Sequence, residues 1–235
     1  MSTHGDIKKR MGVAGKVLVA EGQHDFTRGH ISHRLPDDPS LFFMKAHSLG
    51  LDEISVENIL TIDLDGNVVA GTARRHSEVY IHSEIFRARP DVHCVLHTHP
   101  KYSVALSATG RPMKVYSNPS ALFFEALGTY ADTINLIRTA ELGRGVARAL
   151  GPHRAVLLKN HGVVLAGASI EETVISAIML ENAAQVQMIV EAAGDPAPQF
   201  PDEDIKKLQY DISRPDQFAV NFDYLVRRLQ QPAGH

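Results

Sequence analysis

The chain has 235 residues, and its 24 basic and 27 acidic side chains give a formal net charge of -3. With 44% hydrophobic and 22% charged residues it has the composition of a globular protein, which excludes a disordered or fibrous chain. No dense cluster of lysine and arginine is present, and no apolar run approaches the roughly 20 residues of a membrane span. We therefore expect a soluble small-molecule enzyme with no nucleic-acid or membrane partner. The single cysteine, Cys94, excludes an intrachain disulfide and favours the cytoplasm.

The first third of the chain is predicted to be a helix followed by short strands. The expected elements are a helix at 5–21, a strand or loop at 26–35, strands at 42–45 and 59–63, and a hairpin return at 65–69. Lys16 interrupts the apolar stretch of the helix, so this helix is amphipathic and is not a signal peptide, and Gly22 ends it. The pair Asp65-Gly66 is typical of a tight turn, which indicates antiparallel pairing of the flanking strands.

The rest of the chain alternates helices with strands. The expected elements are a helix from 77 to about 88, a strand at 92–98, a helix near 139–150, two strands within 155–166, and a long helix at 169–194. Ser77 and Ser169 are the expected N-caps, the second with Glu172 as its capping-box partner. Residues 196–235 are predicted to form a helical tail that is too polar to belong to the core. The irregular order of strands and helices indicates a single layered α/β domain over 1–235.

Two of the thirteen histidines stand two residues apart in the predicted strand 92–98. In a strand, side chains i and i+2 point to the same face, so His97 and His99 converge. Neutral imidazole is a common ligand of zinc and related divalent ions, and a chelating pair needs only one or two further ligands. Such a pair can also simply line a surface strand. Cys94 points to the opposite face and is expected to be a small buried apolar residue.

A third histidine and a carboxylate are candidates to complete the site. His161 lies between Asn160 and Gly162, a composition suited to a tight reversal between two apolar strands, so a rigid scaffold holds its imidazole. Its alternative role is a hydrogen bond within its own turn. Glu78 follows Ser77 at a helix start, where the helix dipole stabilises a carboxylate, so its alternative role is a capping charge.

The segment SEVYIHSEIFRARPDVHCVLHTHP at 77–100 and the segment KNHGVVLAG at 159–167 resemble the class II aldolase/adducin family. The resemblance extends over residues 8–195 and depends on the joint pattern of S-E, H-x-H-P and N-H-G. It implies an α/β fold, a single three-layer α/β/α domain with a mostly antiparallel central sheet. It also implies a homotetramer whose active sites lie at subunit interfaces.

In the enzymes of that family, the two strand histidines and the N-H-G histidine bind the metal, and the glutamate is a ligand or an acid/base. The resemblance therefore implies that His97, His99 and His161 hold a divalent ion and that Glu78 is a ligand or the catalytic group. A site of this kind suits manganese, zinc, iron or cobalt. Resemblance to decarboxylases favours manganese, and resemblance to aldolases favours zinc. Adducin keeps the fold without activity, so a non-catalytic module is an alternative.

The chain departs from the family's sugar-phosphate enzymes where these hold the phosphate with small residues. The replacements are Gly29-His30-Ile31-Ser32, Lys45-Ala46-His47-Ser48 and Arg75-His76-Ser77-Glu78. They add bulk and cationic or donor side chains, which suit a flat anion carrying carboxylates. The expected substrate-binding residues are His30, His47, Ser48, Arg75, Ser77 and, from a neighbouring subunit, Tyr210. His76 is a second candidate acid if Glu78 is a ligand, and the alternative is that these histidines are ordinary surface or core residues.

These segments resemble the decarboxylase branch of the family, which implies loss of carbon dioxide from a hydroxy-substituted aromatic or pyridine dicarboxylate. The substrate that the resemblance favours is 3-hydroxy-2-methylpyridine-4,5-dicarboxylate, a compound of vitamin B6 degradation. The metal would act as a Lewis acid, and Glu78 would deliver a proton to the carbon that loses its carboxyl group. An aldolase or epimerase acting on a small hydroxy-carbonyl or sugar substrate is the alternative.

Overall fold

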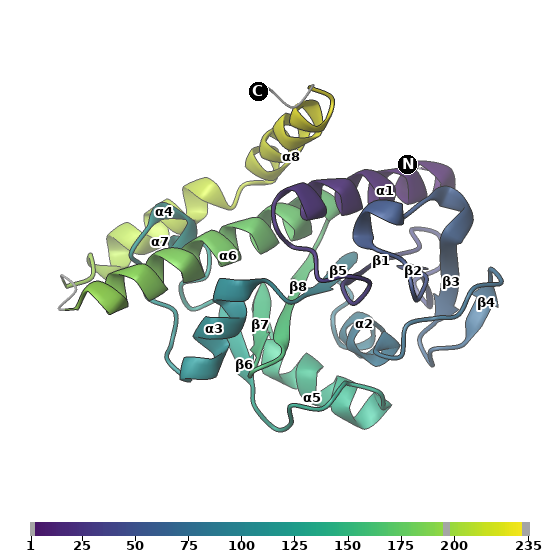
Figure 1. The fold of residues 1–235 in the computed structure, drawn as a ribbon, viewed down its shortest axis with the longest axis horizontal. Coiled ribbons are helices and arrows are strands. Elements are labelled where there is room, and N and C mark those ends of the chain that lie inside the picture. The colour runs from purple at the N-terminus through teal and green to yellow at the C-terminus, as the bar shows by residue number, and fades with distance from the viewer. Residues whose placement is uncertain (1–2, 195–197, 232–235) are drawn as a thin grey trace.

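The structure of the chain, a computed structural model, describes residues 3–194 and 198–231 (Figure 1). The helices are α1 (His4–Ala20), α2 (Val79–Ala88), α3 (Lys101–Thr109), α4 (Asn118–Ala121), α5 (Ala140–Leu150), α6 (Ile170–Ala193), α7 (Asp202–Ile212) and α8 (Pro215–Leu229), with the short 3-10 helices η1 (Leu51–Glu53) and η2 (Val56–Asn58). The strands are β1 (His30–Arg34), β2 (Leu41–Lys45), β3 (Ile59–Asp63), β4 (Val68–Ala70), β5 (Cys94–Thr98), β6 (Leu127–Tyr130), β7 (Ala155–Leu158) and β8 (Gly162–Gly167).

These strands form one sheet in the order β4-β3-β2-β1-β5-β8-β7-β6. Neighbouring strands pair antiparallel, except that β6 and β7 run parallel. The predicted mostly antiparallel sheet is therefore confirmed. The Asp65-Gly66 turn joins β3 to β4, as its sequence indicated.

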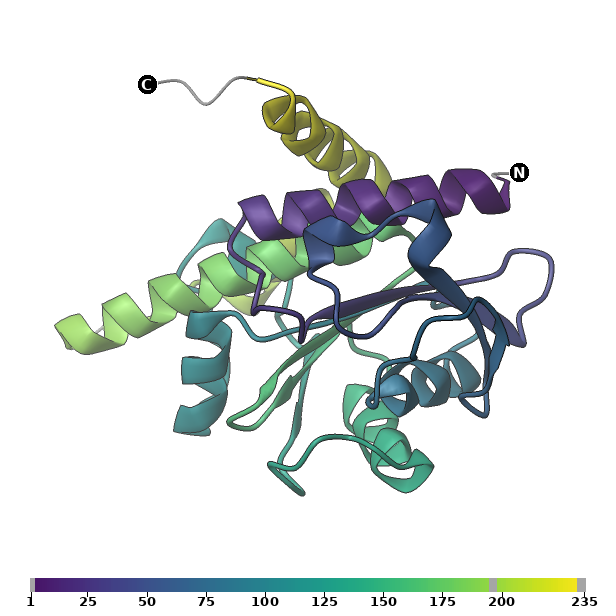
Figure 2. The same ribbon diagram turned by 45° about the vertical axis from the view of Figure 1, so that its right-hand side comes forward.

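Helices cover both faces of the sheet, and this gives the three predicted layers (Figures 1 and 2). One face packs against α2 and α5, and the other packs against α1 and α6 with α3, α4 and α8 beside them. The alternation of β5 shows the division, because Cys94 and Leu96 belong to the α6 side while Val95 belongs to the α2 side. Cys94 is buried as expected, and His97 lies on the same face as Val95.

The beginning of α2 differs from the prediction in a way that matters for the site. Ser77 is not its N-cap: the helix begins at Val79, and Glu78 occupies the cap position without a side-chain capping bond. The carboxylate of Glu78 therefore does not cap α2 and can make contacts elsewhere. At α6 the N-cap is Ser169 as predicted, but Glu172 accepts a hydrogen bond from Ala168 N and so makes no capping box with Ser169.

Five elements were not expected from the sequence, namely η1, η2, α3, α4 and β6. The C-terminal tail is also less polar than predicted, because Phe218 and Phe222 of α8 are fully or almost fully buried in the core. The helix α6 is long and apolar enough to cross a membrane by composition alone, but half of its apolar window is buried inside the fold. Its apolar surface is therefore explained by packing against the sheet and α1.

Candidate functional site

The predicted metal histidines come together where β5 ends and β8 begins. His97 is the fourth residue of β5 and is completely buried, and it points to the α2 side of the sheet. Its Nδ1 lies 2.9 Å from the carbonyl oxygen of Val163. A carbonyl only accepts hydrogen bonds, so the ring proton is on Nδ1 and Nε2 carries the lone pair. Burial lowers the pKa of His97 well below its usual value, so the ring is neutral.

His99 follows the last residue of β5 and reaches the same point from the strand end. Its Nε2 lies 3.0 Å from Nε2 of His97, and its Nδ1 lies 3.0 Å from a carboxylate oxygen of Asp25. A carboxylate beside one nitrogen favours a proton there, which leaves the lone pair on the other. Two lone pairs that face each other at this distance repel unless a cation lies beside them. The donor arrangement of His97 and His99 therefore fits a metal ion.

His161 occupies the turn between β7 and β8, and its two neighbours explain the N-H-G pattern. Asn160 has a φ of 59°, a left-handed conformation that asparagine tolerates. A Cβ atom on Gly162 would lie 2.5 Å from the Thr98 carbonyl oxygen and 2.6 Å from the His99 ring, so only glycine fits there. Neither ring nitrogen of His161 has a hydrogen-bond partner within residues 3–194 and 198–231.

Glu78 brings its carboxylate to the same place from the start of α2. One oxygen, Oε1, accepts a hydrogen bond of 2.9 Å from Ile137 N and lies 3.7 Å from Nε2 of His161. The other, Oε2, lies 4.0 Å from Nε2 of His97 and 3.9 Å from Nε2 of His30. Glu78 therefore stands between two groups of histidines.

The first group, His97, His99 and His161, has the geometry and protonation that a divalent ion requires. One nitrogen from each ring lies within 4.8 Å of the others. Burial lowers the pKa of all three, that of His99 to about 4, so their nitrogens keep their lone pairs at neutral pH. This group, with a carboxylate beside it, could hold a divalent metal ion.

The second group consists of His30, His76 and His82, and the ring of His30 lies beside that of His97, with 5.0 Å between the ring centroids. Nδ1 of His30 and Nε2 of His82 are 2.6 Å apart, and Nδ1 of His82 is 2.6 Å from Oγ of Ser32. Nε2 of His76 lies 3.5 Å from the carbonyl oxygen of Thr27, at the limit of a hydrogen bond. Burial lowers the pKa of His76 to about 4 and that of His82 to about 3, so both rings are neutral.

A buried lysine lies next to this second group. Lys45 is completely buried, and its ammonium donates hydrogen bonds to the carbonyl oxygens of Thr27, Ala46 and Leu49. Burial lowers its pKa to about 8. The positive charge of Lys45 contributes to the lowered pKa of His30 and His76. Lys45 therefore adds positive potential beside the second group, whose imidazoles stay neutral.

A cleft of about 560 Å³ opens over both groups. It exposes three cationic side chains, Arg28, Lys101 and Arg138, together with an apolar side made by Val104, Ile134 and Leu136. The sequence offered no motif for these residues, because they lie on separate loops and on α3 and meet only in the fold. Asp25 and His82 were missed for the same reason.

The predicted substrate-binding residues have different positions in this cleft. His47, His76 and Ser77 line it, and His30 is buried directly behind it. Ser48 lies beside the cleft, where its hydroxyl is 2.6 Å from Nδ1 of His47. Arg75 is not among the lining residues: its guanidinium donates to the carbonyl oxygen of His76 and lies over the ring of Tyr80.

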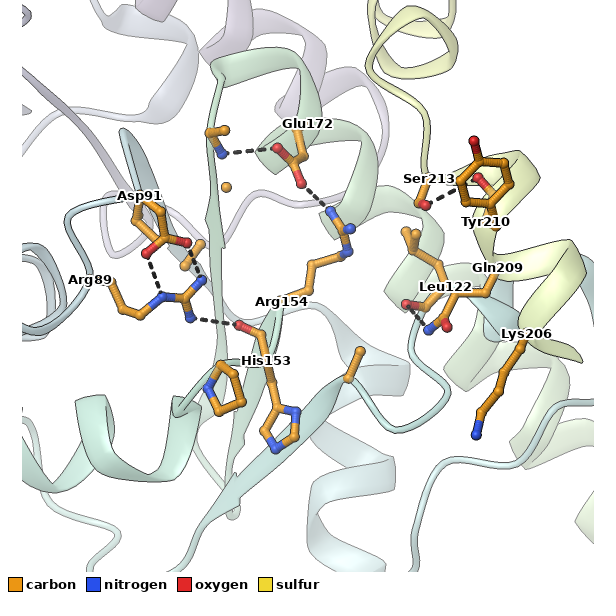
Figure 3. A pocket seen from close by; sticks show the side chains of 16 residues that line it. Arg89, Asp91, Leu122, His153, Arg154, Glu172, Lys206, Gln209, Tyr210 and Ser213 are labelled. Atoms are coloured by element: carbon orange, nitrogen blue, oxygen red, sulfur yellow. Dashed lines mark hydrogen bonds and ion pairs between the residues drawn. The ribbon is translucent and has the colours of Figure 1, made fainter. Parts of the chain in front are cut away.

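Tyr210 lies far from the cleft within one chain. It is 72% exposed on α7 and borders a different pocket of about 420 Å³, at the ends of β7 and β8 remote from His161 (Figure 3). The cationic groups of that pocket are paired, Arg89 with Asp91 and Arg154 with Glu172. Tyr210 therefore takes no part in the site of its own chain, and a contribution to a neighbouring subunit stays a prediction.

Comparisons with known proteins agree with this geometry. Residues 9–188 match the family model described as class II aldolase and adducin N-terminal domain. A 3,4-dihydroxyphthalate decarboxylase of Arthrobacter keyseri is 30% identical over 221 residues, which cover 88% of this chain and 87% of that protein. An L-fuculose phosphate aldolase of Methanococcus maripaludis is 29% identical over 162 residues, which cover 69% of this chain and 85% of that protein.

A solved structure shares the whole architecture. An L-fuculose 1-phosphate aldolase from Glaciozyma antarctica superposes with a TM-score of 0.85 over 98% of this chain and 93% of that chain. Its sequence identity is 24%, so this likeness concerns the fold alone. The family match covers most of the chain, and the decarboxylase relative aligns over nearly its full length. The chain therefore belongs to the class II aldolase and adducin family and, within it, resembles the decarboxylase branch.

Proposed function

We propose that the protein is a metal-dependent decarboxylase of a hydroxy-substituted aromatic or pyridine dicarboxylate. The observation that carries this proposal is the composition of the cleft, which joins a candidate metal triad to a cationic rim and an apolar wall. A planar ring with two carboxylates needs all three features. The 3,4-dihydroxyphthalate decarboxylase that this chain resembles supports the same substrate class.

The metal would be held by His97, His99 and His161, with Glu78 beside it. A divalent ion there would supply Lewis-acid stabilisation of negative charge. Manganese is our first candidate because of the resemblance to decarboxylases, and zinc is the second. The lone pairs and neutral rings described above suit either ion, since imidazole and carboxylate are ligands for both.

The rim and the second histidine group would orient the substrate. Arg28, Lys101 and Arg138 carry positive charge at the mouth of the cleft, where a carboxylate can form charge-assisted hydrogen bonds. Burial lowers the pKa of His76 to about 4, so His76 is a neutral imidazole and not an imidazolium acid at neutral pH. The apolar wall excludes water from one face of the ring.

Glu78 would move the proton of the reaction. As a carboxylate it takes the proton of the ring hydroxyl, and it then delivers this proton to the ring carbon that bears the leaving carboxylate. The carbon–carbon bond breaks, carbon dioxide leaves, and the bonding electrons return to the ring, which becomes aromatic again as the phenolate. One proton is moved and none is consumed until the product takes a proton from solvent.

Several finer features belong to the same proposal. We propose 3-hydroxy-2-methylpyridine-4,5-dicarboxylate, from vitamin B6 degradation, as the first substrate to test, and a cytoplasmic homotetramer as the working form of the enzyme. In such an assembly Tyr210 of one subunit would reach the cleft of another. The exposed position of Tyr210 on α7 leaves its phenol accessible for this contact.

A second candidate function is aldol cleavage or epimerisation of a small hydroxy-carbonyl or sugar substrate. The observation that favours it is the 29% identity to an L-fuculose phosphate aldolase. The bulk of His47 and His76 in the cleft argues against a sugar phosphate, because small residues allow backbone N–H groups to approach the phosphate.

The test is metal analysis of the purified protein together with a carbon dioxide release assay. The substrates are a panel of ortho-hydroxy aromatic and pyridine dicarboxylates, with matched monocarboxylates as controls, and L-fuculose 1-phosphate for aldol cleavage. We expect metal-dependent release of carbon dioxide from at least one diacid. Aldol cleavage by fully loaded protein, without release of carbon dioxide from any diacid, would refute the decarboxylase.

A further inference from the structure

A buried chain of hydrogen bonds lies behind Glu78, and the chemistry proposed above does not use its far end. It runs from His30 through His82 to Ser32, with two contacts of 2.6 Å, and all three side chains are completely buried. His82 lies one helical turn after Glu78 on α2. It does not border the cleft, and both of its ring nitrogens are occupied within the chain. A buried polar group lowers the stability of the fold unless it is paired, so this chain of hydrogen bonds is expected to have a role in the site.

The chain can have either of two polarities. Burial lowers the pKa of both imidazoles, so each ring is neutral and carries one proton. In the first polarity, Ser32 donates to the carbonyl oxygen of Val95, His82 donates to Ser32, and His30 donates to His82, which leaves a lone pair on Nε2 of His30. In the second, Ser32 donates to His82, His82 donates to His30, and Nε2 of His30 carries a proton.

The contacts at the two ends favour the second polarity. The bond from Ser32 to Val95 O is 3.5 Å long, at the limit of a hydrogen bond, so it contributes little to the first. At the other end, Nε2 of His30 lies 3.9 Å from the carboxylate oxygen Oε2 of Glu78, in a region closed to solvent. A negative oxygen attracts an N–H group and repels a lone pair, and this effect is strong in a buried site.

We propose that His82, held by Ser32, is a positioning residue that keeps His30 in the tautomer with the proton on Nε2. His30 then turns a neutral N–H toward the carboxylate of Glu78 and offers no lone pair to a metal ion. The effect of this N–H on turnover depends on the proposed function of Glu78, but the tautomer does not. His97 is the opposite case, because its Nδ1 faces a carbonyl oxygen and its Nε2 is therefore a ligand.

This tautomer decides which group of histidines takes the metal ion. Ligand atoms of His30, His76 and Glu78 also lie within 4.8 Å of one another, so by distance alone they form a second candidate metal group. With a proton on Nε2, His30 cannot be a ligand, and this group does not hold a metal ion. The protein therefore holds one divalent ion per chain, at His97, His99 and His161.

A matched pair of substitutions at position 82 tests the proposal. The amide of His82→Gln can donate to His30 and accept from Ser32, so it allows the original polarity. The carboxylate of His82→Glu has a similar shape but only accepts, so Ser32 still donates to it, while Nδ1 of His30 must now donate as well, which leaves a lone pair on Nε2 of His30.

The expected results separate the two variants in metal content and in kinetics. With manganese or zinc, the wild type and His82→Gln should bind one equivalent per chain, and His82→Glu should bind a second, weaker equivalent. The kcat for the diacid should fall at least ~10-fold in His82→Glu, because an N–H group facing the charged Glu78 carboxylate is lost, and only a few-fold in His82→Gln. The same metal content and the same kcat in both variants would overturn the proposal.

A direct measurement on the wild type keeps the proposal testable if His82→Glu does not fold. Nitrogen-15 NMR of histidine-labelled, zinc-loaded protein distinguishes the two tautomers, and loss of one signal in His30→Gln assigns His30. We expect a proton on Nε2 of His30 and on Nδ1 of His97, and a proton on Nδ1 of His30 would refute the tautomer. This readout needs no turnover, so it stays valid if the protein proves to be an aldolase.

Discussion

Two groups of three histidines meet at Glu78, and the same side chain has a different role in each group. In the first group, Nδ1 of His97 faces a carbonyl oxygen, and Nδ1 of His99 faces the carboxylate of Asp25. In the second group, Nδ1 of His30 faces another imidazole. Acceptors behind His97 and His99 direct lone pairs into the site, while the donor proposed behind His30 directs a proton there.

The difference shows that the partner of the remote ring nitrogen matters as much as the histidine itself. Burial makes both groups neutral, so charge does not distinguish them. What distinguishes His97 from His30 is the direction of the hydrogen bond at Nδ1. Glu78, which lies between the two groups, can then face a metal ion on one side and a substrate on the other.

The largest expected effect comes from removing a member of the first group. His99→Ala should lose the bound metal and lower turnover more than ~1000-fold, because the remaining two histidines cannot hold the ion alone. Elemental analysis and the carbon dioxide assay measure both effects. His153→Ala, which changes a histidine in the pocket at the other end of the sheet, is the matched control and should keep metal and activity. Full metal content in His99→Ala would contradict the assignment.

The second largest effect is expected from Glu78→Gln, which tests whether Glu78 carries a proton or binds the metal ion. Glu78→Gln keeps an oxygen that can accept from Ile137 N, so the loop and the start of α2 should stay in place. If Glu78 carries the proton, turnover should fall roughly 100- to 10,000-fold while the protein keeps most of its metal. Loss of the metal together with turnover would instead make Glu78 a ligand. Metal content and kcat, measured on the same preparation, separate these outcomes.

The sequence predicted the first group far better than its surroundings. The H-x-H spacing in a strand fixes His97 and His99 on one face, and the N-H-G turn fixes His161, while the family resemblance joined the two segments, which meet through the pairing of β5 with β8. The capping rule failed at Ser77, because Glu78 occupies the cap position without a capping bond and its carboxylate goes to Ile137 N.

The second group could be predicted only in part, because its chemistry depends on contacts between distant segments. His30 and His76 were recognised by their departure from a family pattern, but His82 has no such signal and meets His30 across 52 residues. The elements α3 and β6 also lacked a signal in the sequence, because they contain few residues with clear periodicity. Phe218 and Phe222 are buried because α8 packs against α1 and α6. This contact could not be predicted from the mostly polar sequence of the tail.

A smaller effect is expected at the rim of the cleft. Arg138→Met should raise KM for the diacid about 10- to 100-fold with a smaller change in kcat, because a charged donor to a carboxylate is lost far from the reacting carbon. Arg144→Met, on the exposed face of α5 outside the cleft, is the matched control. If KM for the corresponding monocarboxylate rises as much as KM for the diacid, Arg138 does not bind the second carboxylate.

The smallest effect concerns stability in mild acid, to which the second group should contribute through His82 and His76. Their pKa values are lowered to about 3 and about 4 in the folded protein, against an ordinary value near 6.5. Below pH 6.5 the unfolded chain takes up protons that the folded chain refuses, so the free energy of unfolding falls as the pH decreases. Between pH 6.5 and pH 5 each residue should remove about 2 kcal/mol.

Urea unfolding at pH 7 and at pH 5 measures this loss, and His82→Gln isolates one contribution. The variant should lose about 2 kcal/mol less than the wild type between these pH values, since glutamine does not titrate. His24→Gln, at an exposed position, should lose as much as the wild type. An equal loss in wild type and His82→Gln would mean that His82 is not held neutral by burial, and the two groups of histidines would then differ in charge as well as in the direction of their hydrogen bonds.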